Sequence, residues 1–126
     1  MSNKILIVDD NDEFRKIISE FVKSLGLDME VFEAYTGEMA IAKSSFIQPD
    51  IIIMDINLPN MNGLEATRQI KIDNPNCDLV ILTMFDVDVF KKTAQEIDVR
   101  DYIAKSEAFD RLPKVLKACI EEKNKI

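Results

Sequence analysis

The chain has 126 residues, of which 47% are hydrophobic and 31% charged, and we expect one compact globular domain over residues 1–126. It carries 16 Lys and Arg against 23 Asp and Glu, so its net charge is −7. This charge disfavours direct binding of nucleic acid or of an anionic membrane surface. No apolar run approaches the roughly 20 residues that cross a bilayer, or the apolar core of a signal peptide, so we expect a cytoplasmic protein.

The chain contains no histidine, and its two cysteines, Cys77 and Cys119, stand far apart. The absence of histidine excludes Ser-His-Asp and Cys-His triads, imidazole metal ligands and a phosphohistidine within this chain. Neither cysteine belongs to a CxxC pair, so a disulfide framework or a zinc site is not expected. Any chemistry must therefore depend on carboxylates, hydroxyls and lysine.

The first half of the chain contains three strand-like runs, over residues 5–8, 30–34 and 51–54. The first and third are apolar at every position, as expected for strands buried on both faces of a parallel sheet. Three residues have the chemistry of helix ends: Gly26 as a C-terminal cap, and Thr36 and Asn62 as N-caps. A one-sided amphipathic helix is predicted after the first strand from its apolar residues: Phe14, Ile17, Ile18, Phe21, Val22 and Leu25.

The second half contains two further strand-like runs, over residues 79–82 and 101–104. Helical spacing predicts a fourth helix over 87–97 and a fifth over 112–120, with Pro113 in the first turn of the fifth. The second and fifth strands are less apolar and are predicted to be edge strands. The alternation predicts an α/β fold of (βα)5 type. This is a doubly wound, five-stranded parallel sheet of flavodoxin-like order 2-1-3-4-5 in a three-layer αβα arrangement.

Polar residues directly follow four of the strands: Asp9 and Asp10, Asp55, Thr83, and Lys105. In a parallel sheet these ends share the edge where ligands bind. Two unit charges 4 Å apart repel by about 4 kcal/mol at an effective dielectric constant of 20, so the acidic residues need a cation. Oxygen ligands without His or Cys suit Mg²⁺. We therefore expect a phosphoryl reaction with Asp55 as the nucleophile, in which Lys105 and Thr83 contact the phosphoryl oxygens.

These strand ends resemble the receiver domain of two-component response regulators, in particular chemotaxis-regulator-like receivers. The resemblance covers essentially the whole chain and is carried by Ile5–Asp10, Met54–Gly63, Leu82–Thr83 and Ala104–Lys105. It implies that Asp55 is the phosphoacceptor. It also implies that Asp10, Asp55 and the backbone carbonyl of Asn57 bind Mg²⁺, with Asp9 supporting the metal through water.

The resemblance further implies a conformational switch formed by Thr83 and Tyr102. Thr83 would be drawn toward the phosphoryl group while the ring of Tyr102 turns inward, changing the face formed by the fourth helix, fifth strand and fifth helix. The implied partners are a histidine kinase or phosphotransfer protein, and a DNA-binding output domain or downstream protein. A phosphorylation-linked homodimer is also implied. Such a chain is a signalling phosphoacceptor and not an enzyme, since it performs only self-directed phosphotransfer and autodephosphorylation.

Two positions depart from the family pattern. Met84 stands where many receivers have a small residue, and it is long enough to narrow access to the phosphoryl site. Both Met61 and Met84 are otherwise expected to be packing residues. The segment Ile97–Arg100 replaces a turn that commonly contains glycine, which affects the expected shape of this connection and of the partner surface.

Other functions stay open at this point. A Mg²⁺-dependent phosphatase with an aspartyl nucleophile usually carries a second Asp two positions later, where this chain has Asn57. A receiver that is never phosphorylated would be a binding module, although the complete set of site residues argues against it. Flavin binding is disfavoured because residues 9–13 contain four carboxylates where a flavin phosphate would lie. Singly, each site residue has an ordinary structural explanation, and only their joint placement points to the receiver.

Overall fold

A computed structural model describes residues 3–124. Five parallel strands form a single sheet in the order β2-β1-β3-β4-β5, which confirms the predicted order and places β2 and β5 at the edges. The predicted strand boundaries differ from the observed ones by at most two residues at either end. The strands are β1 (Asn3–Val8), β2 (Met29–Ala34), β3 (Ile51–Met54), β4 (Asp78–Thr83) and β5 (Asp101–Ala104).

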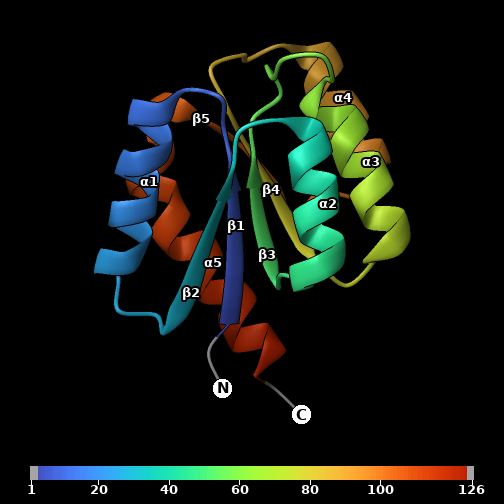
Figure 1. The fold of residues 1–126 in the computed structure, drawn as a ribbon. Helices are drawn as coiled ribbons and strands as arrows, with labels where there is room; N and C mark the ends of the chain where they lie inside the picture. The colour runs from blue at the N-terminus through green and yellow to red at the C-terminus, as the bar shows by residue number, and fades with distance from the viewer. Residues whose placement is uncertain (1–2, 125–126) are drawn as a thin grey trace.

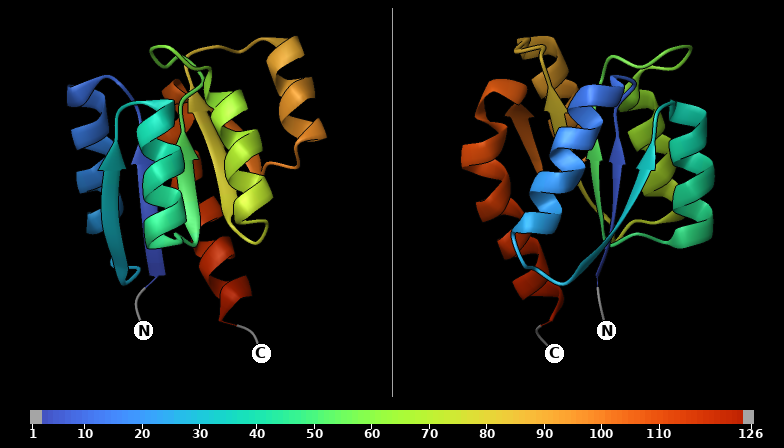
Figure 2. Two further views of the ribbon diagram at one scale, coloured as in Figure 1. Left: turned by 45° about the vertical axis from the view of Figure 1, so that its right-hand side comes forward. Right: turned by 60° about the vertical axis from the view of Figure 1, so that its left-hand side comes forward.

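Helices cover both faces of the sheet, so the predicted three-layer αβα arrangement is confirmed. Figure 1 shows α1 and α5 on one face and α2, α3 and α4 on the other, and Figure 2 shows the same layers from two further directions. Within residues 3–124, no helix is both long enough and apolar enough to span a bilayer. The helices are α1 (Asp12–Ser24), α2 (Gly37–Ile47), α3 (Gly63–Asp73), α4 (Asp88–Glu96) and α5 (Ala108–Lys123), and a short 3-10 helix, η1 (Lys105–Glu107), precedes α5.

Two hydrophobic clusters fill the space between the sheet and its helices. Successive residues of β1 alternate between them, with Ile5 and Ile7 on the side of α1 and α5 and Leu6 and Val8 on the side of α2 and α3. All four side chains are at most 1% exposed. The continuous apolar runs of the sequence therefore follow from burial on both faces of the sheet.

The helix ends use the residues that the sequence indicates. The Oγ1 of Thr36 accepts a hydrogen bond from the backbone N–H of Met39 at 3.0 Å, and Oδ1 of Asn62 accepts one from Leu64 at 2.7 Å. Gly26 follows α1 with a φ of +67°, a left-handed conformation that glycine adopts without steric cost. These caps fix where the chain turns back toward the sheet.

Two helical predictions are wrong in detail. The helix α5 begins at Ala108, directly after η1, so Pro113 is its sixth residue and not part of its first turn. A proline there cannot donate the usual hydrogen bond to the carbonyl of Phe109. The side chain of Ile17 is 47% exposed, because α1 buries a narrower stripe than its apolar pattern indicates.

The two cysteines are free thiols buried in the two hydrophobic clusters, as the sequence predicts. Burial raises the pKa of the Cys77 thiol to about 12 and that of the Cys119 thiol to about 12. Both thiols are therefore protonated at neutral pH and serve as small apolar groups.

The helix α4 is held to the sheet more loosely than α3. Ala94 is the one buried residue within α4, whereas α3 has five. Val87 precedes α4 without a side-chain hydrogen bond to the first turn. In Figure 2, left, α4 stands out beyond α3 at the end of this layer.

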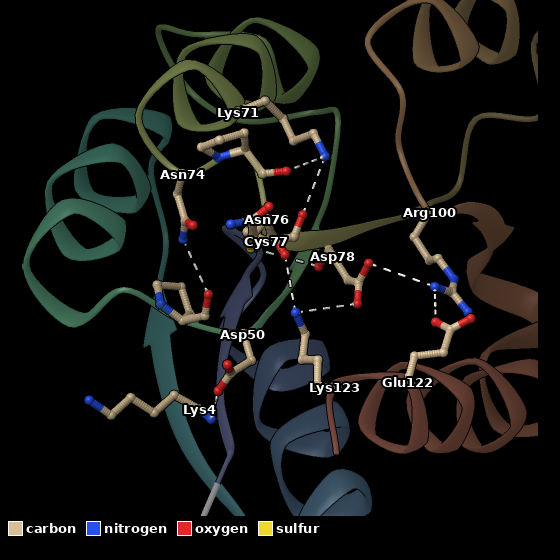
Figure 3. Close-up of polar contacts among 12 residues, drawn as sticks. Lys4, Asp50, Lys71, Asn74, Asn76, Cys77, Asp78, Arg100, Glu122 and Lys123 are labelled. Carbon is tan, nitrogen blue, oxygen red and sulfur yellow. Dashed lines mark hydrogen bonds and ion pairs between the residues drawn. The ribbon is translucent and has the colours of Figure 1, made fainter. Parts of the chain in front are cut away.

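At the edge where the strands begin, β4 is tied to the last turn of α5. The carboxylate of Asp78 lies 3.6 Å from Nζ of Lys123 and 3.8 Å from a guanidinium nitrogen of Arg100. Arg100 also pairs with Glu122, as Figure 3 shows. The backbone N–H of Arg100 donates to the carbonyl of Leu79 at 2.7 Å. These contacts fix the α4–β5 connection and the end of α5 to the same point.

The α4–β5 connection makes a left-handed turn without glycine. Asp98 has a φ of +58° and lies in the segment Ile97–Arg100, where the family pattern commonly has glycine. Asp adopts this conformation more readily than most residues do, but its Cβ still makes the backbone strained there. The segment Ile97–Arg100 therefore forms, without glycine, a turn that glycine would form with less strain.

Replacing Asp98 with glycine is expected to raise the free energy of unfolding by about 0.5–1 kcal/mol, because glycine adopts a positive φ without strain. Equilibrium urea unfolding measures the change. The matched variant Asp98→Ala places at this positive φ a residue that tolerates it less well than Asp, and it is expected to lower the free energy of unfolding by about 1 kcal/mol. A less stable Asp98→Gly protein would contradict this account of the turn.

Candidate functional site

Lys105 joins two buried carboxylates at the carboxyl ends of the strands. Its Nζ lies 2.8 Å from Oδ2 of Asp9, which follows β1, and 3.1 Å from Oδ2 of Asp55, which follows β3. Asp9 is 3% exposed and Asp55 is 5% exposed. The structure thus brings together three of the residues that the sequence places at this edge.

Asp10 completes an acidic cluster with these two residues. One carboxylate oxygen from each of Asp9, Asp10 and Asp55 can be chosen such that all three lie within 4.8 Å of one another. Asp10 is exposed, so the cluster opens to solvent on one side. A set of carboxylate oxygens with an open side fits a hard divalent cation that keeps some of its water, as Mg²⁺ does. The residues present therefore fit the metal that the sequence indicates.

Backbone N–H groups hold the two buried carboxylates in place. Oδ1 of Asp9 accepts a hydrogen bond from Asn11 at 2.8 Å, and Oδ1 of Asp55 accepts one from Asn57 at 3.3 Å. Each aspartate thus closes a turn with the residue two positions later. Asn57 lies beside Asp55 at the start of the β3–α3 loop, and ligation by its backbone carbonyl stays a prediction.

The start of α3 packs directly against the backbone of Asp55. The N–H of Gly63 donates to the carbonyl of Ile56 at 2.8 Å. A Cβ at position 63 would lie 1.9 Å from the carbonyl oxygen of Asp55, closer than any real contact. The sequence pattern indicates a helix start here, but the close approach of Gly63 to Asp55 is a tertiary contact that the pattern does not contain. Gly63 therefore fixes the backbone that carries the proposed nucleophile.

Thr83 and Tyr102 contact the same residue of the β4–α4 loop. Thr83 ends β4 and is fully buried, and its Oγ1 accepts a hydrogen bond from the N–H of Phe85 at 3.3 Å. The hydroxyl of Tyr102 donates to the carbonyl of Phe85. The structure therefore connects the two predicted switch residues through the backbone of one residue, Phe85. The sequence does not reveal this link because Phe85 belongs to no motif.

The mouth of the site beside Lys105 is largely apolar. Nζ of Lys105 lies 4.3 Å from the centre of the Phe14 ring. Met84 is 78% exposed, so the prediction that it is a packing residue is wrong, whereas Met61 packs against a hydrophobic cluster as predicted. A hollow of about 400 Å³ is lined by Phe14, Met84, Ala104, Lys105 and Ser106.

The pKa values of Asp55 and Lys105 are both raised, but for different reasons. Burial raises the pKa of the Asp55 carboxyl, and the neighbouring Asp9 raises it further, while Lys105 acts in the opposite sense. For Lys105, burial alone would lower the pKa, but hydrogen bonds and charge from Asp9 and Asp55 outweigh it and raise the pKa. Lys105 is therefore a permanent cation at neutral pH, beside a carboxylate whose ionisation the protein opposes.

The sequence matches a known family over nearly the whole chain. Residues 5–117 match the family model described as the response regulator receiver domain. The chain belongs to the family of response regulator receiver domains.

Named relatives agree with this assignment. The response regulator protein VraR of Staphylococcus aureus is 39% identical over 107 residues, which cover 84% of this chain and 51% of that protein. The chain thus spans about half the length of such relatives. A two-component response regulator of the LuxR family from Aurantimonas sp. SI85-9A1 has a similar structure, with a TM-score of 0.88 at 27% identity. The match covers 97% of this chain and 87% of the solved one.

One similar structure was solved with a metal. It is the receiver domain of a sensor histidine kinase from Pseudomonas aeruginosa PAO1, described with a magnesium ion coordinated in the active site cleft. The match has a TM-score of 0.84 at 26% identity, and covers 96% of this chain and 99% of that one. A magnesium ion is therefore known in the cleft of a similar receiver.

Introducing a methyl group at position 63 is expected to lower the free energy of unfolding by about 2–3 kcal/mol, because the carbonyl of Asp55 must move to admit it. Chemical denaturation of Gly63→Ala measures the loss. Gly37→Ala is the matched control, since the three atoms nearest to a Cβ there belong to the side chain of Met61 at 3.0–3.2 Å, whereas at position 63 the nearest is a backbone oxygen at 1.9 Å. Equal losses in the two variants would show that the contact with Asp55 has no special importance.

Asp55→Asn is expected to raise the melting temperature by a few degrees at pH 7 in the absence of divalent cations. Burial raises the pKa of Asp55, so the folded state opposes ionisation more than the unfolded state does, and a neutral amide removes that cost. The gain should shrink as the pH falls through the raised pKa of the folded carboxyl, and it should be gone below the ordinary Asp pKa of about 4, where the carboxyl is protonated in both states.

Melting curves from pH 3 to pH 8 test this dependence, with the exposed Glu30→Gln as a control that should show no comparable gain. A variant that melts below the unsubstituted protein at pH 7 would contradict the expected sign.

Proposed function

We propose that this receiver domain accepts a phosphoryl group on Asp55 from the phosphohistidine of a histidine kinase or phosphotransfer protein. The observation that supports the proposal most is the contact between a buried Asp55 carboxylate and the ammonium group of Lys105 within the acidic cluster. A buried carboxylate held beside a permanent cation is suited to nucleophilic attack on a phosphoryl group.

In the proposed step, a carboxylate oxygen of Asp55 attacks phosphorus. The bond between phosphorus and the donor nitrogen breaks, the imidazole leaves with its electron pair, and Asp55 becomes an acyl phosphate. The ammonium group of Lys105 moves from its partner carboxylates to the phosphoryl oxygens. Asp10, Asp55 and the backbone carbonyl of Asn57 would hold Mg²⁺, which supplies charge neutralisation for those oxygens.

The second part of the proposal concerns Asp9 and the switch. Asp9 supports the metal through water and keeps Lys105 in the site. Thr83 reaches the phosphoryl group by giving up its hydrogen bond with Phe85, which frees the loop that also holds the Tyr102 hydroxyl. The ring of Tyr102 then turns inward, and the exposed face formed by α4, β5 and α5 changes.

This face would carry the signal to a DNA-binding output domain or a separate downstream protein, and it would support a phosphorylation-linked homodimer. The family assignment and the length of the relatives support such an output. We place the domain in the cytoplasm, without direct contacts to nucleic acid or membrane. It is not an enzyme acting on other substrates, because its phosphotransfer and autodephosphorylation are directed at itself.

Intact mass spectrometry after incubation with Mg²⁺ and a small acyl-phosphate donor tests the proposal. We expect a single phosphoryl adduct that EDTA prevents and that Asp55→Asn abolishes, while the exposed Glu30→Gln is labelled like the unsubstituted protein. Full labelling of Asp55→Asn at another aspartate would overturn the site assignment. A folded protein that is never labelled would instead be a binding module.

Assay of external phosphate esters separates the receiver from a phosphatase with an aspartyl nucleophile. Asn57 stands where such a phosphatase usually carries its acid–base Asp, so we expect no turnover. Repeated release of phosphate from an added ester would contradict the receiver proposal.

A further inference from the structure

Arg15 connects α1, the β1–α1 loop and β2 beside the acidic cluster. It is the fourth residue of α1, and its side chain is 13% exposed. Its Nη1 donates to the backbone carbonyl of Asp9 at 2.7 Å, Nη2 to Oδ1 of Asp12 at 2.8 Å, and Nε to Oε1 of Glu33 at 2.9 Å. The guanidinium carbon lies 5.6 Å from the centre of the Tyr35 ring. Each guanidinium nitrogen therefore has an acceptor, and the group is held in one orientation.

The carbonyl that Arg15 contacts belongs to the peptide between Asp9 and Asp10. A peptide is planar, so a hydrogen bond to its oxygen fixes the plane from which the Asp10 side chain extends. The carboxylate of Asp9 is held separately, by Asn11 and Lys105. In the part of the chain that the structure describes, the carboxylate of Asp10 has no hydrogen-bond or ion-pair partner. Its direction therefore depends on the backbone that Arg15 holds.

Arg15 also separates the carboxylates of this loop into two groups. Asp12 and Glu33 each form an ion pair with the guanidinium group. The acidic cluster of Asp9, Asp10 and Asp55 does not include them. The positive charge of Arg15 further offsets repulsion within a loop rich in acidic residues, and it does so at any pH because a guanidinium group stays protonated.

We infer that Arg15 is a positioning residue for the metal site, acting through the Asp9–Asp10 peptide to aim the Asp10 carboxylate at the acidic cluster. The inference rests on the proposed function, because it requires that the cluster binds Mg²⁺. Arg15 does not touch the metal in this arrangement. Its contribution is to hold a ligand in the bound direction before the cation arrives, which reduces the ordering needed on binding.

Titration of nitrogen-15-labelled protein with MgCl₂, followed by amide chemical shifts, tests the role of Arg15. We expect Arg15→Gln to weaken Mg²⁺ binding by about tenfold, the usual lower limit when a group that orients a ligand is lost. Arg15→Lys keeps the charge but not the planar group of donors, and it should restore only part of the affinity. The control Arg68→Gln breaks an exposed ion pair with Glu65 on α3 and should leave the affinity unchanged.

The titration is made at a temperature where circular dichroism shows each variant folded. A purely structural role would lower the melting temperature of Arg15→Gln and leave its Mg²⁺ dissociation constant within twofold of the original, and that result would overturn the inference. If Arg15→Gln does not fold, Arg15→Lys is compared with the unsubstituted protein, and an unchanged constant is again the contrary result.

The same titration distinguishes this inference from the proposed function. Tight Mg²⁺ binding without labelling of Asp55 would contradict the phosphoacceptor proposal and leave the comparison of Arg15 variants valid. An unsubstituted protein that binds no Mg²⁺ at its acidic cluster would overturn the inference about Arg15, because no metal site would then exist to be positioned.

Discussion

Burial of the central strands on both faces is the constraint that decides where this domain can place polar chemistry. The side chains of β1 and β3 are apolar at every inward position, because one helical layer covers each face. Charged groups of these central strands are thereby confined to the strand ends. The carboxyl ends gather Asp9, Asp55 and Lys105, and the opposite ends hold structural ion pairs such as those of Asp78. The location of the site thus follows from the packing of the sheet.

The site itself works against the stability of the fold. Three carboxylates lie close together, and two of them are nearly removed from water. Lys105 offsets this from within the site, and Arg15 does so from behind the β1–α1 loop. The two cations differ in kind: the ammonium group can be redirected to a new anion, whereas the guanidinium group is locked by three acceptors. One is suited to take part in a reaction, and the other to keep the site in shape.

Sequence reasoning recovered what depends on periodicity and on strand ends. The strand order, the caps at Thr36 and Asn62, and the meeting of Asp9, Asp55 and Lys105 all follow from local pattern and from the geometry of a parallel sheet. It failed where tertiary contacts decide. The exposure of Met84 depends on how a loop lies over the sheet, and the link through Phe85 uses backbone atoms that any residue would offer. The fifth helix is predicted to begin at Leu112, but α5 begins at Ala108 because η1 leads directly into it. The apolar pattern of the helix does not show this earlier start.

The loose attachment of α4 has an energetic consequence for signalling. A segment with few buried contacts can open locally at a small fraction of the free energy of global unfolding. Since Ala94 is its one buried residue and Phe90 only a partly buried one, reorienting α4 would leave the cluster on the side of α1 and α5 intact and remove few contacts from the other. A modest difference in free energy between two loop arrangements is then enough to repopulate the orientations of this helix. The domain thereby combines a rigid candidate site with a surface whose shape is only weakly determined, and any partner that covered α4 would help to select that shape.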